Sequence, residues 1–391
     1  MRILHLAYED PRRPGSGGGS VRTYEINRRL AERHEITAVV AGYPGARERV
    51  EDGVRWIPIG THTGTTRDQL TYFALLPSVV RRHLHDLVVE DFGAPFSTGF
   101  APLFTRKPVV ASVQWLFARE KRIEYGLPFD WVESLGLGCY HDFIAVSDWL
   151  AGKLRARRPR AVVEAIPNGV DPLAFTAPSL APRHYLYVGR LEIEHKGCDL
   201  LLESMALIHV ELGDATPPLV VVGDGPDRER LEARAGELGL TTLVQFRGRV
   251  EGAAKYALMA AAYAVLIPSR YETFGMVAVE SLAAGAPVVA FRVGPLEEVA
   301  AGGATSLAPP FDVVAFAAAA VHLFREYDAA DLAERRRAGR RRAGLYDWDA
   351  LAPRQDSHYH DAVARGRVSR STVRQRGVLD LPPQRSHGRG A

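Results

Sequence analysis

Two glutamates, Glu272 and Glu280, stand at places where a carboxylate can do chemistry. The apolar run 264–267 is closed by a proline and predicts a strand, whereas residues 274–284 have a helical pattern that ends at a glycine. We therefore expect Glu272 on the turn between strand and helix, and Glu280 within the helix. Open parallel sheets bind their ligands at the carboxyl ends of the strands, so both side chains are candidates for ligand contact.

The start of the same helix offers backbone N–H groups to an anion. The N–H groups of Phe274, Gly275, Met276 and Val277 would lie at its positive end, where a phosphate is favoured. An acidic residue near a helix start also has an ordinary explanation, because it complements the helix dipole. Glu280 is harder to explain in this way, since its neighbours are apolar and a carboxylate among them usually needs a partner.

Glycines and cations occupy two further loops. Residues 10–20 are glycine-rich and follow the first predicted strand, and Gly18 and Gly19 would let the backbone approach a ligand closely. The stretch lacks the Gly-Lys-Ser/Thr end of a Walker loop and matches the dinucleotide fingerprint poorly, so a flexible loop is its simplest interpretation. In the second half, Arg190 and Lys196 follow a strand and offer fixed charges for a diphosphate.

Composition excludes several classes of protein. With 47% hydrophobic and 24% charged residues, the chain has the composition of a soluble globular protein, and a net charge of +3 argues against a dedicated nucleic-acid binder. The two cysteines, Cys139 and Cys198, cannot build a disulfide framework, which favours a reducing cytoplasm. The first apolar run is too short for a secretory signal, and no run reaches the roughly 18 residues of a spanning helix.

Short apolar runs alternate with helical patterns, which predicts βαβ units and mostly parallel sheets. The strands expected in the first half are 3–7, 36–41, 54–59, 87–90, 109–112, 143–146 and 162–166. Those of the second half are 185–188, 219–222, 243–246, 264–267 and 288–290. Because 391 residues are too many for one comfortable core, we expect two doubly wound Rossmann-like domains, 1–175 and 185–345, with a proline-containing linker at 176–184.

The C-terminal residues differ from the rest. A last helix is expected at 346–365. Residues 366–391 contain six arginines against one acid, which is typical of a disordered basic tail; contact with an acidic surface is the minor alternative.

Taken together, these segments resemble the retaining GT-B glycosyltransferases of family 4, which use nucleotide-diphosphate sugars. The resemblance covers roughly residues 2–364 and rests on residues 17–19, 167–171 with Phe175, 188–197, 223–226 and 272–280. It implies a GT-B fold, in which two Rossmann-like domains face each other across a cleft. The first domain would serve the acceptor and the second the nucleotide sugar, and the last helix would cross back to the first domain.

The resemblance also implies roles for individual residues. Arg190 and Lys196 would stabilise the donor diphosphate, Glu272 would lie against the transferred sugar, and Glu280 would hydrogen-bond the ribose. The other donor-binding residues that it implies are Gly18, Gly19, Phe274, Gly275, Met276 and Val277, with Arg249 and Val250 at the nucleotide base.

The implied reaction is transfer with retention at the anomeric carbon, with the leaving diphosphate stabilised mainly by cations. No Asp-x-Asp motif is evident and such enzymes generally need no bound metal, so neither a metal nor another cofactor is expected to be essential. Many relatives carry a histidine where this chain has Gln114 and Trp115, on the acceptor side. Trp115 would stack on a sugar there or pack in the core.

Alternatives remain at this stage. A nucleotide-sugar 2-epimerase of the same fold and a non-catalytic nucleotide-sugar-binding protein share these features. The expected partners are a nucleotide-sugar donor and an unidentified glycan, lipid or small-molecule acceptor. The basic residues between Lys153 and Arg160, beside Trp149, indicate a solvated helix face or a weak reversible contact with the inner face of a membrane.

Overall fold

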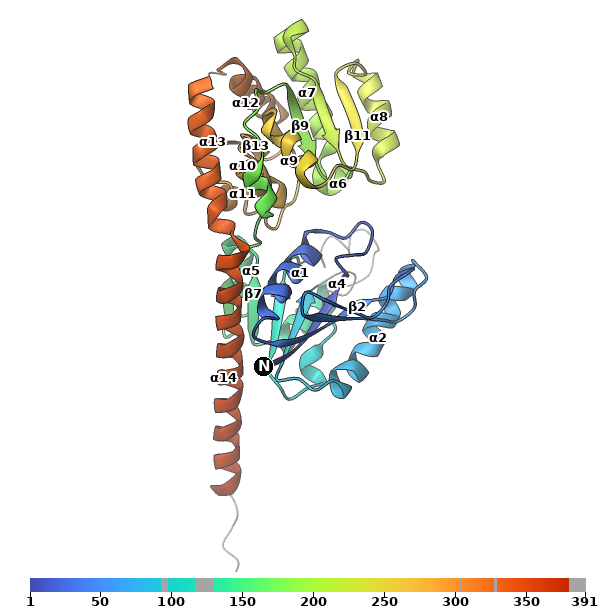
Figure 1. Cartoon of the computed structure of the whole chain (residues 1–391), viewed down its shortest axis with the longest axis vertical. Coiled ribbons are helices and arrows are strands. Elements are labelled where there is room, and N and C mark those ends of the chain that lie inside the picture. The colour runs from blue at the N-terminus through green and yellow to red at the C-terminus, as the bar shows by residue number, and fades with distance from the viewer. Residues whose placement is uncertain (93–97, 117–128, 303, 327–328, 380–391) are drawn as a thin grey trace, which may run out of the picture.

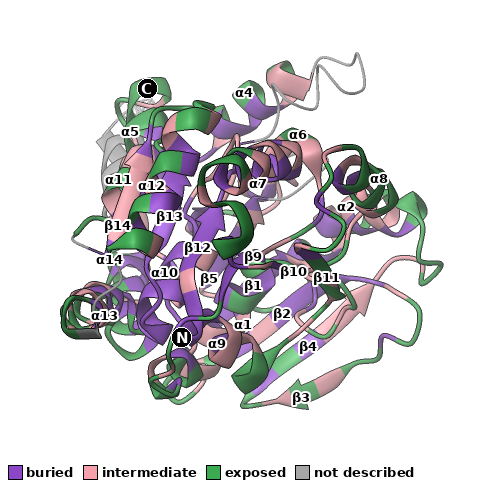
Figure 2. Ribbon diagram, turned by 90° about the horizontal axis from the view of Figure 1, so that it is seen from above, coloured by how far each residue is buried: buried purple, intermediate pink, exposed green. Residues whose placement is uncertain are grey.

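The chain folds into two α/β units that stand one above the other, with α13 and α14 along one side (Figure 1). A computed structural model describes residues 1–92, 98–116, 129–302, 304–326 and 329–379, with side chains as far as Arg367. Buried residues concentrate in the strands and on the helix faces turned toward them (Figure 2). Among the described residues, no helix is both long and apolar enough to cross a membrane.

The first unit is built on an eight-stranded sheet of order β3-β4-β2-β1-β5-β6-β7-β8, in which only β3 is antiparallel to its neighbour. Its strands are β1 (Arg2–Tyr8), β2 (Glu35–Ala41), β3 (Arg49–Glu51), β4 (Val54–Ile59), β5 (Leu87–Phe92), β6 (Val109–Val113), β7 (Asp142–Ala145) and β8 (Val162–Ala165). The helices described between them are α1 (Gly18–Leu30), α2 (Thr66–Arg82), α4 (Phe129–Cys139) and α5 (Asp148–Arg157).

The second unit has a six-stranded parallel sheet of order β11-β10-β9-β12-β13-β14. Its strands are β9 (His184–Val188), β10 (Leu219–Val222), β11 (Val244–Gly248), β12 (Ala262–Ile267), β13 (Val288–Phe291) and β14 (Thr305–Ala308). Its helices are α6 (Ile193–Lys196), α7 (Cys198–Leu212), α8 (Arg228–Glu237), α9 (Gly252–Ala260), α10 (Met276–Ala284), α11 (Leu296–Val299), α12 (Val313–Arg325) and α13 (Ala329–Ala343).

The predicted fold class is confirmed: each expected strand overlaps an observed one, and the sheets are almost wholly parallel. Two strands, β3 and β14, were not predicted. The sequence did carry a signal for β3, because Asp52-Gly53 joins it to β4 with positive φ values of 48° and 77°. Asp-Gly with both residues in this conformation is typical of a tight hairpin.

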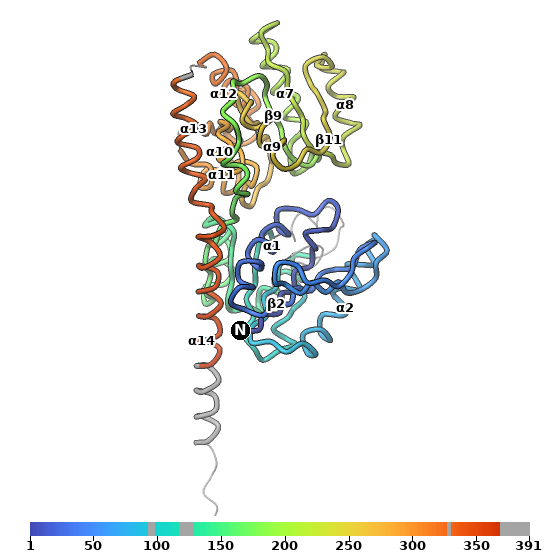
Figure 3. Tube along the Cα trace, in the orientation of Figure 1, coloured from blue at the N-terminus to red at the C-terminus, as the bar shows by residue number. Residues whose placement is uncertain are grey.

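The chain passes between the units twice, and the two passages run side by side. It leaves the first sheet after β8 and enters the second at β9, then returns through the short helix Gly344–Tyr346 into α14 (Trp348–Leu379). Val170 and Asp347 form a parallel bridge, and the Val170 N–H donates to the Tyr346 carbonyl at 2.8 Å. The tube in Figure 3 shows the returning segment beside the outgoing one.

A buried arginine on α1 joins both passages. Nη1 of Arg22 donates to the carbonyls of Ile166 and Pro167, at 2.9 and 2.7 Å, and to Oδ1 of Asn168 at 3.1 Å. Its Nη2 donates to Oε1 of Gln355 on α14 at 2.6 Å. Burial lowers the pKa of Arg22 to about 10, so the guanidinium still carries its charge at neutral pH.

Helix α14 packs on the first sheet as part of its core. Trp348, Leu351 and Tyr359 belong to the same buried cluster as strand residues of β1, β2 and β5. The helix continues to Leu379, beyond the expected end at residue 365 and into the segment predicted to be a disordered tail. Residues 380–391 lie outside the described part of the chain.

Replacing Arg22 with leucine should lower the free energy of unfolding by about 3 kcal/mol, because several buried acceptors lose their donor. Arg28→Leu on the same helix is the matched control. Arg28 is partly exposed and pairs with Glu25, so its loss should cost less than about 1 kcal/mol. Urea denaturation of both variants measures the difference, and equal midpoints would contradict the role given to Arg22.

Candidate active site

Lys196 and Glu272 form an ion pair at the carboxyl end of the second sheet. Nζ of Lys196 donates to Oε1 of Glu272 at 2.6 Å, and the hydroxyl of Ser269 donates to the same oxygen at 2.9 Å. Gly197 makes this approach possible. Its φ is 62°, and a Cβ there would lie 2.1 Å from the carbonyl oxygen of Pro268. A side chain at this position would push the turn, and Lys196 with it, away from the end of β12.

Arg270 holds the Lys196 turn from the other side. Its guanidinium makes two hydrogen bonds to the carboxylate of Asp199, at 2.6 and 2.8 Å, and a third to the Ile193 carbonyl at 2.7 Å. Burial opposes ionisation of Asp199, but the hydrogen bonds and charge of Arg270 more than offset it and lower the pKa of that carboxyl. The bidentate pair therefore fixes α6 and the start of α7 against the turn that carries Glu272.

Glu280 has the partner that its apolar surroundings require. Nζ of Lys255, on α9, donates to its Oε1 at 3.0 Å. Burial raises the pKa of Glu280, and the Lys255 ammonium offsets part of that rise. The neighbouring Tyr256 hydroxyl donates to Oδ2 of Asp171 at 3.0 Å, so the group extends into the passage between the two units.

The amino end of α10 faces the glycine-rich loop of the first unit. The helix begins at Met276, two residues later than the predicted start, and Gly275 precedes it with a φ of 95°. N–H groups in a first helical turn have no partner within the helix, so this end suits an anion. A Cβ on Gly18 would lie 3.2 Å from Cγ of Met276, which shows how closely the loop approaches α10.

The acceptor-side candidates lie at the same junction. Nε2 of Gln114 donates to the Gly19 carbonyl at 3.2 Å and so holds the glycine-rich loop. The Trp115 ring stacks on Tyr271 with centroids 5.5 Å apart, directly beside Glu272 in the chain. The edge of His195 meets the same indole at 5.6 Å. Trp115 therefore contacts residues of the second unit.

The remaining predicted residues are less constrained. The Arg190 side chain is 66% exposed and forms a long ion pair, 3.9 Å, with Glu192. Arg249 is exposed, and its Nη2 would be 3.5 Å from a Cβ on Gly15 of the opposite loop. Val250 and Phe274 pack against the hydrophobic core. Arg190 and Arg249 thus offer exposed positive charge at the junction, whereas Lys196 is held in the ion pair with Glu272.

Hydrogen bonds between side chains and backbone groups hold the two units together here. The hydroxyl of Ser147 donates to the Thr273 carbonyl at 3.0 Å. The Glu298 carboxylate accepts from the N–H groups of Asp148 and Trp149, at 2.8 and 3.0 Å, and so caps α5 from the opposite unit. The leucines of α5 face the core and are fully buried, and Arg157 pairs with Glu133 of α4.

Sequence reasoning missed several residues of this site. They are His195, Asp199, Lys255, Tyr256, Ser269, Arg270 and Tyr271. Asp171, which Tyr256 contacts, lay within the segment 167–171 that carries the resemblance but was given no role. Arg270 and Tyr271 directly precede Glu272, so their position was a usable signal. Lys255 lies on α9, 25 residues before its partner Glu280 on α10. No local sequence pattern predicts a contact between them.

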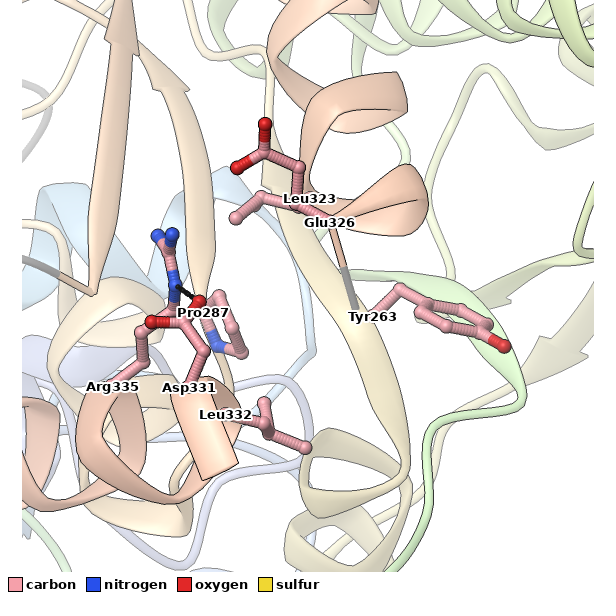
Figure 4. A pocket seen from close by; sticks show the side chains of 7 residues that line it. All are labelled: Tyr263, Pro287, Leu323, Glu326, Asp331, Leu332 and Arg335. Atoms are coloured by element: carbon pink, nitrogen blue, oxygen red, sulfur yellow. Dashed lines mark hydrogen bonds and ion pairs between the residues drawn. The ribbon is translucent and has the colours of Figure 1, made fainter. Parts of the chain in front are cut away.

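A surface pocket elsewhere contains none of the predicted residues (Figure 4). It is lined by Tyr263, Pro287, Leu323, Glu326, Asp331, Leu332 and Arg335, and the Asp331–Arg335 ion pair closes one side. It lies at the far end of β12 from Glu272, next to α12 and α13.

Comparison with known proteins agrees with this architecture. The family profile described as Glycosyltransferase Family 4 matches residues 16–172, and the one described as Glycosyl transferases group 1 matches residues 182–326. The phosphatidyl-myo-inositol mannosyltransferase of Mycobacterium leprae is 31% identical over 346 residues, which cover 84% of this chain and 88% of that protein. The glycogen synthase of Mycobacterium tuberculosis is 33% identical over 198 residues, 49% of this chain, and the match spans 47% of that protein.

Solved structures share the fold at low identity. Sucrose-phosphate synthase from Thermosynechococcus elongatus superposes with a TM-score of 0.77 at 22% identity, covering 93% of this chain and 99% of that one. The Anabaena protein HepE in complex with UDP and glucose gives 0.69 at 19% identity, covering 91% and 98%. The two facing Rossmann-like units are therefore those of a GT-B protein. The chain belongs to the family 4 glycosyltransferases.

Replacing Gly197 with alanine should displace the Lys196 turn and lower the thermal unfolding midpoint. The matched control is Gly239→Ala, because Gly239 has a similar φ of 71° but nothing within 4 Å of its Cβ position. Both variants carry the cost of a left-handed residue, and Gly197→Ala should add about 2 kcal/mol for the contact with Pro268. Equal shifts of the two midpoints would show that the close approach is unimportant.

Proposed function

We propose that this chain transfers a hexosyl group from a nucleoside-diphosphate sugar to a hydroxyl group of an acceptor, with retention of the anomeric configuration. The observation that carries the proposal is the fixed Lys196–Glu272 pair beside the amino end of α10, with the glycine-rich loop of the other unit against the same helix end. A cation, a helix start and a close backbone approach together suit a diphosphate. The adjacent carboxylate suits sugar hydroxyls.

The roles divide between charge and position. Lys196, with Arg190 free to join it, would stabilise the charge that grows on the leaving diphosphate. The bond between the anomeric carbon and the phosphate oxygen breaks and its electron pair leaves with the diphosphate, while the acceptor oxygen bonds the anomeric carbon. The acceptor proton goes to the departing phosphate oxygen. Glu272 would orient the sugar, and Glu280 would accept a hydrogen bond from the ribose.

Names of relatives guide the choice of donor. A GDP-mannose-dependent phosphatidylinositol dimannoside mannosyltransferase from Mycobacterium tuberculosis is 35% identical over 171 residues, which cover 43% of this chain and 41% of that protein. GDP-mannose is therefore the first donor to test, followed by UDP- and ADP-linked sugars. We propose that the transfer itself needs no metal, since cationic side chains can stabilise the leaving diphosphate in its place.

The direct test measures nucleoside diphosphate released from a panel of nucleotide sugars, with and without candidate glycan, lipid and small-molecule acceptors. Lys196→Ala should lower kcat by about 10²–10³-fold with the best donor, because a fixed charge at the leaving group is lost. Lys107→Ala, an exposed lysine of the first unit, should leave the rate unchanged. Full activity in Lys196→Ala would refute the mechanism.

Glu280→Gln should act mainly on donor binding. The amide keeps one acceptor oxygen but loses the charge that attracts ribose hydroxyls, so we expect KM for the donor to rise about tenfold with a smaller change in kcat. Steady-state kinetics at several donor concentrations separate the two constants. A loss confined to kcat would place Glu280 at the reacting centre instead.

Two outcomes would favour the alternatives. Conversion of the nucleotide sugar without any acceptor, followed by nuclear magnetic resonance of the product, would indicate a 2-epimerase. Tight binding of a nucleotide sugar without turnover under any condition would indicate a non-catalytic binding protein.

A further inference from the structure

Three metal-ligating side chains, His34, Asp356 and His360, come together where α14 docks on the first unit. Asp349, Asp356 and His360 are seven and four residues apart, so they share one face of α14. That face meets α1 and the turn after it: Asp349 pairs with Arg29 at 2.5 Å, and Asp356 pairs with His34 at 2.7 Å. His360 stands one helical turn beyond Asp356 on the same side.

The three side chains are already close enough to share an ion. Nε2 of His34 lies 2.7 Å from Oδ1 of Asp356, and Nδ1 of His360 lies 3.2 Å from the same oxygen. One ligand atom from each residue falls within 4.8 Å of the other two. Tetrahedral zinc with bonds of about 2.0–2.1 Å needs ligand atoms about 3.4 Å apart. Nδ1 of His360 also lies 2.9 Å from the Asp356 carbonyl oxygen, so the His360 ring would have to turn away from that carbonyl to complete the coordination geometry.

The surroundings favour an ordered site over a loose surface group. The side chains of His34 and Asp356 are only 5% and 13% exposed, whereas that of His360 is 56% exposed. Nδ1 of His34 lies 3.2 Å from the terminal nitrogen of Met1, and its Nε2 faces Asp356. Two ligands are thus held in place, and the third, on the open side, leaves room for a water as fourth ligand.

We propose that His34, Asp356 and His360 bind a divalent transition metal, with zinc the best match to two imidazoles and one carboxylate. The ion would tie α14, at the end of the chain, to the turn between α1 and β2. Zinc accepts a tetrahedral set of nitrogen and oxygen ligands without a redox role, so its contribution here is structural. Bound metal stabilises the folded state because the three ligands are brought together only by folding.

This site is separate from the proposed transfer chemistry. His34 directly precedes β2, and Arg2 at the start of β1 pairs with Glu35, so the cluster lies at the amino ends of the strands. Lys196 and Glu272 lie at carboxyl ends of the other sheet. The ion would therefore leave the donor cleft untouched, and the inference stands whether or not the proposed function does.

Zinc binding to the whole chain, purified without a polyhistidine tag, tests the proposal by isothermal titration calorimetry. The wild type should bind one tight equivalent that His360→Ala and Asp356→Asn weaken by roughly 10- to 100-fold or more. His322→Ala is the matched control. His322 and Glu326 form an exposed pair with the same i,i+4 spacing at the end of α12, but they are not part of a three-ligand group among the described residues.

Cobalt and thermal unfolding provide independent readouts. Cobalt bound to the wild type should give the visible absorption of a tetrahedral site, and His360→Ala should lose it. Zinc should raise the unfolding midpoint of the wild type and of His322→Ala but not of His360→Ala, and a chelator should reverse the rise without lowering turnover at a temperature well below unfolding. The same zinc affinity and the same midpoint shift in wild type and His360→Ala would overturn the proposal. The three side chains would then form ordinary ion pairs and no metal site.

Discussion

The structure depends on a junction in which a buried guanidinium ties two passages of the chain to one helix. Arg22 reaches the backbone leaving the first sheet and Gln355 on the helix that returns to it. A buried charge is costly unless it is hydrogen-bonded, and here Nη1 and Nη2 donate to groups near residue 167 and to Gln355, which is 333 residues from Arg22. Four residues before Arg22, Gly18 meets the start of α10. The junction and the site therefore share a single rigid helix.

The site is assembled by close approach as much as by charge. Gly197 allows the Lys196 turn to lie close to the end of β12, and Arg270 hydrogen-bonds Asp199 on the other side of that turn. The backbone thus holds Lys196 beside Glu272. Lys196 therefore needs little rearrangement to stabilise a negative charge that develops nearby. Electrostatic stabilisation is most effective when the groups that provide it are fixed beforehand. Arg190, by contrast, is mostly exposed and lies 3.9 Å from Glu192.

Helix α14 connects these features to the outer surface of the first unit. Its apolar face completes the core beneath the first sheet, while its polar face is pinned to α1 and the following turn by a series of ion pairs. The metal site proposed at His34, Asp356 and His360 would strengthen this docking. Such a tie stabilises the first unit by closing the chain onto itself, and it leaves the carboxyl ends of the strands available for chemistry.

The sequence by itself determined the two α/β units with their mostly parallel sheets, because apolar runs and helical periodicity are local patterns. It also predicted that Glu272 and Glu280 flank a helix start, since glycine and proline mark the ends of the elements around them. Only the tertiary structure decided their partners. Lys255 and Glu280 meet across two helices, and His34 meets Asp356 across most of the chain. Such contacts depend on how the helices and strands pack together, and the spacing of residues along the sequence does not predict that packing.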